Sequence, residues 1–251
     1  MPRRLNDKSE IRRLLNTDRE WSLYALADLD DGMFEHCDWQ AHGDALSLVF
    51  RALHIRPIFV LGDSAATREL LAAVAEPSGY LNLKPEQLDA AHGIYEFRER
   101  HHMRRMFLDD PNPRIGATEP LTIQHSTEID RLYATGDGGG IAFAPFQLSA
   151  GFFRGIRRGG ELLAVAGVHV VSHQESVAGL GNIFTRPDCR GAGLAQTVVS
   201  GVAMALCEAG IRTIGLNVEE TNAPAIRAYE RIGFRTHLDY YEGTADRCVP
   251  A

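Results

Sequence analysis

The chain has 251 residues, of which 45% are hydrophobic and 24% charged, values typical of a globular protein with one or two domains. Its formal net charge of −7 argues against nucleic acid as the main partner, because phosphate backbones attract basic surfaces. Neither a signal-peptide pattern nor an apolar run of roughly 20 residues is visible, so we expect a cytoplasmic protein without a membrane span. Reduced thiols are expected in that location. No metal site is expected, because no Cys-x-x-Cys pair occurs among Cys37, Cys189, Cys207 and Cys248.

The first half of the chain predicts alternating helices and strands. Apolar spacing from Ile11 to Leu29 predicts an amphipathic helix. Further on we expect strands at 45–52 and 58–61, a helix from Gly62-Asp63-Ser64 to Val74, a strand at 80–83, a helix with Pro85 near its start and a strand around 96–108. The proline-rich stretch 108–120 then predicts a boundary between an N-terminal α/β domain, residues 1–112, and a second domain, residues 113–251.

The second half repeats the alternation of strand and helix. We expect a helix at 123–133, a glycine loop at 136–140, a helix or substrate loop from 145, strands at 161–171 and 176–185, a helix at 193–208, a strand at 211–218, a helix at 225–232 and a strand at 235–242. This order predicts an α/β (α+β) architecture with a mixed sheet and flanking helices.

The most informative segment joins the strand at 176–185 to the helix at 193–208. It runs through Arg190-Gly191-Ala192-Gly193-Leu194-Ala195. Free backbone N–H groups converge where a helix begins, and glycines let an anion approach the main chain. Arg190 adds a positive charge, so the segment predicts a phosphate site.

Motif spacing excludes two common phosphate sites. A P-loop needs Lys-Ser/Thr after its last glycine, and here Leu194-Ala195 follows. A dinucleotide fingerprint needs Gly or Ala three residues after its second glycine, and Gln196 stands there. A dehydrogenase or an NTPase is therefore not supported.

A second motif follows at residues 211–234. A strand leads to Asn222-x-Pro224, at the position of a helix cap, and then to a helix that ends at Gly233-Phe234. Tyr229 lies four residues before Gly233. Together, Arg190-x-x-Gly193-x-Ala195 and Asn222…Tyr229-x-x-x-Gly233-Phe234 resemble the motifs of the GNAT superfamily of acyl-CoA-dependent N-acyltransferases, over about residues 118–245. The resemblance implies a GNAT-like mixed, mostly antiparallel sheet, with acetyl-CoA as the co-substrate and an amine as the acceptor.

The resemblance also assigns roles to individual residues. The pyrophosphate is expected at Arg190, Gly191, Ala192, Gly193, Leu194 and Ala195. The pantetheine chain is expected along Ile183, Phe184 and Thr185, with an N–H near Phe184 polarising the thioester carbonyl. Asn222 either binds the CoA arm or merely caps its helix.

Tyr229 is the expected general acid, because a phenol can protonate a departing thiolate, although helical spacing also allows a core aromatic. Many family members place a Glu on the strand before the phosphate loop, and residues 176–185 contain no acid. Glu219 is our choice of base; Glu175, Glu220, His169, His173 and a water relay stay open.

The first half resembles a diverged copy of the second, as in tandem GNAT proteins such as the glycine-N-acyltransferase-like group. Its turn offers one glycine followed by Asp63, whose charge repels pyrophosphate, so we expect a scaffold, dimer surface or substrate wall. A cage for a cationic substrate around Trp21 and Trp39 is a less favoured alternative. We expect a monomer or homodimer that acts on a small-molecule or peptide amine; the competing function is an acyl-CoA-binding sensor or structural module without turnover.

Overall fold

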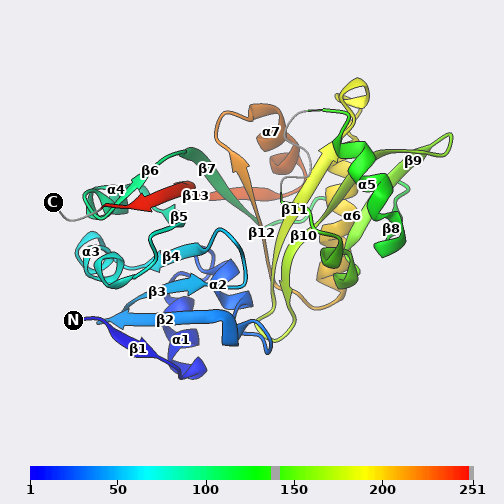
Figure 1. Ribbon diagram of the computed structural model, residues 1–251. Helices are drawn as coiled ribbons and strands as arrows, with labels where there is room; N and C mark the ends of the chain where they lie inside the picture. Colours follow the sequence, from blue (N-terminus) through cyan, green and yellow to red (C-terminus); the bar gives the residue numbers. More distant parts are fainter. Residues whose placement is uncertain (137–141, 249–251) are drawn as a thin grey trace. The chain divides into compact units, whose positions relative to one another are not determined.

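The computed structural model describes residues 1–136 and 142–248, and Figure 1 traces the chain. Contacts divide the chain into two compact units. Unit 1 contains Met1–Arg105, Glu219–Thr221 and His237–Ala251, and unit 2 contains Met106–Val218 and Asn222–Thr236. None of the helices in the described part of the chain is long and apolar enough to cross a bilayer.

Unit 1 is built around a sheet with strand order β1-β2-β3-β4-β5-β13, in which β6 also pairs with β13. All neighbouring strands are antiparallel except β4 and β5. Its elements are β1 (Arg3–Leu5), α1 (Lys8–Leu15), η1 (Asn16–Asp18), α2 (Leu23–Ala27), η2 (Phe34–His36), β2 (Cys37–His42), β3 (Ala45–Phe50), β4 (Pro57–Leu61), α3 (Ser64–Ala73), β5 (Ser78–Leu83), η3 (Pro85–Gln87), α4 (Leu88–Ala91), β6 (Tyr95–Phe97) and most of β7 (His101–Leu108).

The single helix predicted from Ile11 to Leu29 is wrong, because two short helices, α1 and α2, replace it. Between them the Thr17 hydroxyl donates to the Leu14 carbonyl, and the Asp18 carboxylate accepts the Trp21 N–H. Such side chains compete with the helical backbone, so the apolar spacing continues through a broken helix. The strand predicted around 96–108 is likewise two strands, β6 and β7.

The alternative of an aromatic cage for a substrate cation does not hold for Trp21 and Trp39, which are both buried. The guanidinium of Arg105 already lies over the ring of Trp21. The Arg105 guanidinium lies 4.7 Å from the Trp21 ring centre, and its Nη1 donates to the Trp21 carbonyl oxygen over 2.6 Å. This aromatic cluster therefore stabilises a buried arginine in unit 1.

Unit 2 has a sheet with strand order β8-β9-β10-β11-β12, in which only β11 and β12 are parallel. The predicted mixed, mostly antiparallel sheet with flanking helices is confirmed. The elements are β8 (Glu119–Leu121), η4 (Ile123–His125), α5 (Ser126–Tyr133), η5 (Pro145–Ala150), β9 (Phe153–Arg158), β10 (Glu161–Ser172), β11 (Val177–Thr185), η6 (Pro187–Cys189), α6 (Leu194–Glu208), β12 (Thr213–Glu219) and α7 (Ala223–Arg231), after which β13 (Phe234–Arg247) begins. The predicted glycine loop 136–140 lies largely outside the described residues.

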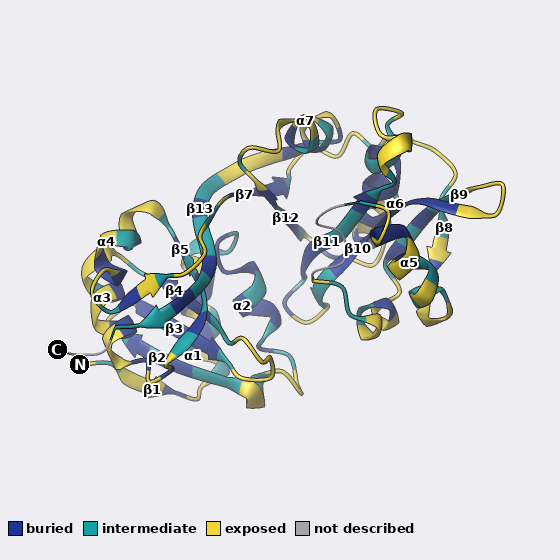
Figure 2. Cartoon of the chain, turned by 45° about the horizontal axis from the view of Figure 1, so that its top comes forward, coloured by how far each residue is buried: buried dark blue, intermediate teal, exposed yellow. Residues whose placement is uncertain are grey.

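The long helix α6 positions the predicted phosphate site. It packs across β9, β10 and β11, and the buried colour of these elements in Figure 2 marks the core of unit 2. Val198, Val199, Val202 and Leu206 recur at helical spacing on its buried face. The helix is thereby fixed against the sheet, with its first turn directly after the turn that follows β11.

Strand β13 belongs to both units by its contacts. Its first residues pack in unit 2, and from His237 onward it lies in unit 1, where it pairs antiparallel with β5. The expected division into 1–112 and 113–251 assigns this strand wholly to the second domain. Sequence alone could not locate it, because pairing between Tyr241 and Leu83 joins residues far apart in the chain.

Candidate functional site

The turn between β11 and α6 has the geometry of an anion site. Gly191 has φ +80° and Gly193 has φ +79°, a backbone conformation that glycine adopts without strain. Gly193 is the N-cap residue, and no side chain caps this end of α6. The first turn contains no acidic residue. Leu194 and Ala195 open the helix, where backbone N–H groups lack intrahelical acceptors.

Arg190 stands beside this turn. Its Nε donates to the Thr185 carbonyl oxygen over 3.3 Å, and its guanidinium lies 5.8 Å from the centre of the Phe184 ring. No carboxylate forms an ion pair with it in the described part of the chain. Its charge is consequently available to a ligand.

The end of β11 is open on one edge. The parallel ladder between β11 and β12 pairs Val177–Leu180 with Thr213–Leu216 and goes no further, although β11 continues to Thr185. On the other edge, Phe184 and Thr185 are in register with Val165 and Ala164 of β10. Among the described residues, 183–185 thus have no strand partner on this edge, although Arg190 Nε contacts the Thr185 carbonyl oxygen, and the edge can pair with an amide-containing chain.

Asn182 lies just beyond Leu180, the last residue of β11 that pairs with β12. It has φ +56°, rare for a residue other than glycine, and lies at an irregularity in the β10–β11 ladder. The Tyr133 hydroxyl donates to its carbonyl oxygen over 3.0 Å, and its Nδ2 donates to Gln147 Oε1 over 3.0 Å. These bonds offset a backbone strain of about 1–3 kcal/mol. Sequence reasoning missed this residue, because a lone asparagine in a strand carries no signal for a bulge.

Thr185 adds an unsatisfied polar group at the same place. Its Oγ1 is buried and has no hydrogen-bond partner among the described residues. Buried hydroxyls are nearly always paired in folded proteins, so a water molecule or a ligand atom would satisfy this one. Thr185 and the unpaired strand edge therefore both fit a polar ligand chain.

Tyr229 lies in α7 with its ring buried beside Phe234, at 6.2 Å between ring centres. Burial raises the pKa of its phenol to about 12, so the group stays protonated at every physiological pH. The hydroxyl makes no hydrogen bond to any described residue. Although buried, the side chain therefore keeps a proton that it can donate.

Asn222 caps α7 as the helical pattern predicts. Its side-chain oxygen accepts the Ala225 N–H over 3.2 Å. The cap role uses the oxygen alone, and the amide N–H groups can still donate to a ligand.

Glu219 ends β12, is exposed, and belongs by its contacts to unit 1 rather than to the unit of Tyr229. Its carboxylate lies 3.7 Å from His101 Nδ1. Among the other candidates for the base, the Glu220 carboxylate lies 3.8 Å from Arg104 Nη2. Glu175 is buried, and His173 lies beside Phe152. Which of these groups acts as the base therefore stays a prediction.

His169 packs tightly over Gly181 in neighbouring strands. A Cβ atom on Gly181 would lie 2.1 Å from His169 Nε2, so only glycine fits there. Burial lowers the pKa of His169 to about 4, which leaves a neutral imidazole that is a weak base at neutral pH.

The low pKa of His169 predicts acid sensitivity. An unfolded histidine titrates near 6.5, so between pH 6.5 and 4 the unfolded chain binds a proton that the folded protein does not. The free energy of unfolding should therefore fall as the pH falls, by about 2 kcal/mol between pH 7 and 5 from this residue. Urea unfolding of wild type and His169→Gln at both pH values measures the difference. Equal losses in the two proteins would contradict the assignment.

The strand–turn–helix of unit 1 that parallels the anion site is closed by its own side chains. The Asp63 carboxylate accepts the Ala66 N–H at the start of α3 over 2.8 Å. A Cβ on Gly62 would lie 2.5 Å from the Cβ of Ala45, so no larger residue fits at this turn. This supports the expectation that the N-terminal copy does not bind pyrophosphate.

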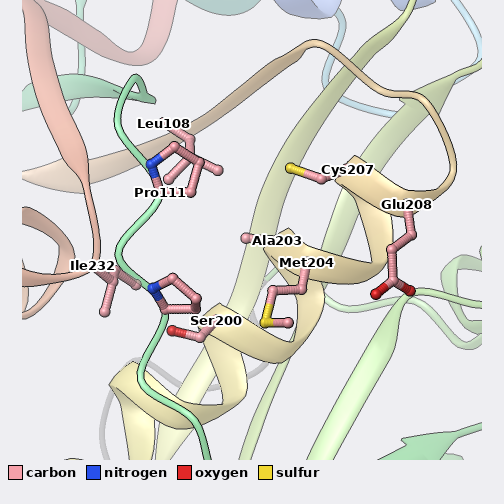
Figure 3. Close-up of a pocket in the computed structure, with 9 residues that line it drawn as sticks. Leu108, Pro111, Ser200, Ala203, Met204, Cys207, Glu208 and Ile232 are labelled. Atoms are coloured by element: carbon pink, nitrogen blue, oxygen red, sulfur yellow. The ribbon is translucent and has the colours of Figure 1, made fainter.

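Two other features of the surface share no residue with the glycine turn. An apolar pocket of about 230 Å³ lies beside α6, between Pro111, Met204 and Cys207, and contains none of the residues of the glycine turn (Figure 3). In unit 1, Asp18 and His237 lie close enough to share a metal ion with Glu20. The Lys84 ammonium, however, lies 2.7 Å from Asp18 and already neutralises that carboxylate.

Comparisons with known proteins agree with this geometry. The chain matches the acetyltransferase (GNAT) family over residues 122–234. It is 28% identical to the mycothiol acetyltransferase of Streptomyces coelicolor over 167 residues, 58% of this chain and 52% of that protein. It is 36% identical to the mycothiol acetyltransferase of Actinosynnema mirum over 62 residues, 25% of this chain and 21% of that protein. The chain thus spans about half or less of the length of these relatives.

A solved structure extends the likeness to the whole chain. A tandem GNAT protein from the clavulanic acid biosynthesis pathway has a TM-score of 0.60 and 13% identity, and the match covers 100% of this chain and 99% of that one. At this identity the likeness concerns the fold alone. Residues 122–234 form a domain of the acetyltransferase (GNAT) family, within a chain that shares its fold along its whole length with a tandem GNAT protein.

Proposed function

We propose that the protein is an N-acetyltransferase that moves an acetyl group from acetyl-CoA to a primary amine of a small molecule or peptide by direct attack. One observation carries the proposal: the uncapped N-terminus of α6, with Gly191 and Gly193 in left-handed conformation, directly follows a strand whose edge is unpaired. A diphosphate linked to an amide-containing arm matches this pair of features.

The residues of the site fit acetyl-CoA. The segment from Arg190 to Ala195 would hold the pyrophosphate through backbone N–H groups, with Arg190 adding charge. The edge of residues 183–185 would pair with the pantetheine amides, and the buried Thr185 hydroxyl would gain a partner. The Asn222 amide N–H groups would donate to the same arm.

The chemistry follows from these placements. The lone pair of the amine nitrogen attacks the thioester carbonyl, and the N–H near Phe184 stabilises the oxyanion that forms. When this intermediate collapses, the carbon–sulfur bond breaks and the sulfur takes the Tyr229 proton, giving free CoA and the amide. A phenol with a pKa of about 12 is a weaker acid than a thiol with a pKa of about 8.5, so the sulfur keeps the proton only if the proton released by the amine returns to the tyrosine.

The acceptor must lose its protons before and during attack. An amine with a pKa of ~10.4 is protonated at pH 7, because its pKa lies about 3.4 units above the pH. Its deprotonation therefore costs roughly 4–5 kcal/mol. Glu219 is proposed as the base, and a water relay fits equally well, because Glu219 is exposed beside His101. The proton that the amine releases restores the tyrosine through solvent.

The division of labour between the domains is also a proposal. Residues 113–251 would bind acetyl-CoA, and residues 1–112 would serve as a scaffold, dimer surface or substrate wall. The four cysteines are free, which supports a reducing, cytoplasmic location. The protein would act as a monomer or homodimer, with no nucleic acid, membrane or metal partner.

A second candidate function is acyl-CoA binding without turnover. The observation that favours it is the absence of an acid on β11 together with the exposed position of Glu219. The two functions share the phosphate turn and differ in what Tyr229 does.

A turnover assay tests the proposal. The purified chain is incubated with acetyl-CoA and a panel of primary amines, and free thiol release is followed together with the mass of the amine. An increase of one acetyl group in one amine, with an equal amount of CoA released, is the expected result. Tight acetyl-CoA binding with no acetylated product across amines of every charge would favour the sensor.

A further inference from the structure

The turn at the start of α6 receives a second arginine from a distant part of the chain. Arg114 follows the proline-rich stretch, and its guanidinium lies against Gly193: a Cβ built on that glycine would be 2.6 Å from the Arg114 Cζ. The absence of a side chain at Gly193 therefore has a specific consequence, because it lets a cation lie on the N-cap residue of α6.

Arg114 is held in this place by the helix itself. Its backbone N–H donates to the Ser200 hydroxyl over 2.9 Å, and its Nη1 donates to Gln196 Oε1 over 3.2 Å. Two residues further on, Gly116 packs so closely on Thr197 that a Cβ would lie 2.6 Å from it. The segment is thus anchored along α6, and the position of the guanidinium is set by contacts on both sides.

The electrostatics of this arrangement are unfavourable in the free protein. The N-terminus of a helix carries partial positive charge and disfavours cations. Here Arg114 and Arg190 both stand at that end, the first turn has no acidic residue, and no carboxylate pairs with either arginine in the described ranges. Among the described residues, the Arg114 side chain donates a hydrogen bond only to the neutral amide of Gln196. A bound anion would neutralise all three sources of positive charge.

We infer that Arg114 binds a phosphate group of the acyl-CoA, as a second positively charged side chain beside the glycine turn. This inference rests on the proposed function and extends it to a residue that none of the sequence motifs includes. Guanidinium groups bind phosphate oxygens in pairs of parallel hydrogen bonds, and no acidic side chain of the described residues pairs with Arg114. The ligand offers Arg114 two phosphate groups to bind, the pyrophosphate and the 3′-phosphate.

Titration calorimetry with acetyl-CoA on Arg114→Ala, Arg114→Lys and wild type tests the inference. Loss of a charge-assisted hydrogen bond should raise Kd about 10- to 100-fold in Arg114→Ala. Arg114→Lys should restore part of the affinity, because it keeps the charge without the planar fork. The matched control is Arg212→Ala: Arg212 is also exposed and lies beyond the opposite end of α6, and its removal should leave Kd unchanged.

Dephospho-CoA, which lacks the 3′-phosphate, separates the two sources of phosphate. If Arg114 binds the 3′-phosphate, wild type and Arg114→Ala should bind dephospho-CoA equally; if it binds the pyrophosphate, the defect should persist. Arg114→Ala that binds acetyl-CoA as tightly as wild type, or more tightly, would overturn the inference. Failure of wild type and Arg212→Ala to bind at all would instead contradict the proposed function.

Discussion

Acetyl-CoA binding is expected to disappear when Gly191 is replaced by Glu. Gly191 has φ +80°, where a side chain costs about 1–2 kcal/mol, and the added carboxylate would lie among the N–H groups that are expected to hold the pyrophosphate. Strain and charge repulsion together should raise Kd by more than about 100-fold, as titration calorimetry can measure.

Gly210→Glu is the matched control for this prediction. Gly210 has φ +82°, and a Cβ there also meets nothing within 4 Å, so the variant carries the same backbone strain and the same new charge. It lies just past the opposite end of α6. Binding retained in Gly210→Glu and lost in Gly191→Glu locates the phosphate site at the glycine turn. Equal affinities in the two variants would place the site elsewhere.

Turnover is expected to fall about 100-fold or more when Tyr229 is replaced by Phe, with little change in acetyl-CoA affinity. The substitution keeps the ring beside Phe234 and removes only the proton donor. General acid catalysis contributes about 10²- to 10⁴-fold to the rate, and the loss should appear in kcat.

The control for Tyr229→Phe is Tyr241→Phe. Tyr241 lies in unit 1, where its ring stacks on His102, and its hydroxyl has no role in the proposed chemistry. We expect this variant to keep the wild-type kcat. If Tyr229→Phe turned over at the wild-type rate, Tyr229 would be a core aromatic, as its helical spacing alone also allows.

The part of the fold that could be predicted is the part specified by local sequence. Helix α6, strand β11 and the cap of α7 by Asn222 follow from apolar spacing, glycine and capping residues, and each lies close to its expected range. Edge strands such as β1 and β8 were not expected, because three residues with a single buried side chain carry no periodic signal. The break between α1 and α2 depends on side-chain hydrogen bonds that apolar spacing does not reveal.

The residues of the candidate site likewise fall into those specified by local sequence and those that depend on distant parts of the chain. Gly191 and Gly193 stand in a continuous motif, and their left-handed conformations agree with the predicted turn. Asn182 and Arg114 were missed because each acts through residues far away in the chain, Gln147 in one case and Gly193 in the other. The base chosen from sequence, Glu219, stays a prediction, since it follows a strand end whose surroundings depend on tertiary contacts.

The most direct test of this account is a calorimetric titration of the wild-type chain with acetyl-CoA. The account predicts micromolar affinity and one site per chain, because the turn of unit 2 is open to an anion and that of unit 1 is capped by Asp63. A folded wild-type protein that releases no heat with acetyl-CoA would contradict the central claim, and two equal sites per chain would contradict the assignment of unit 1.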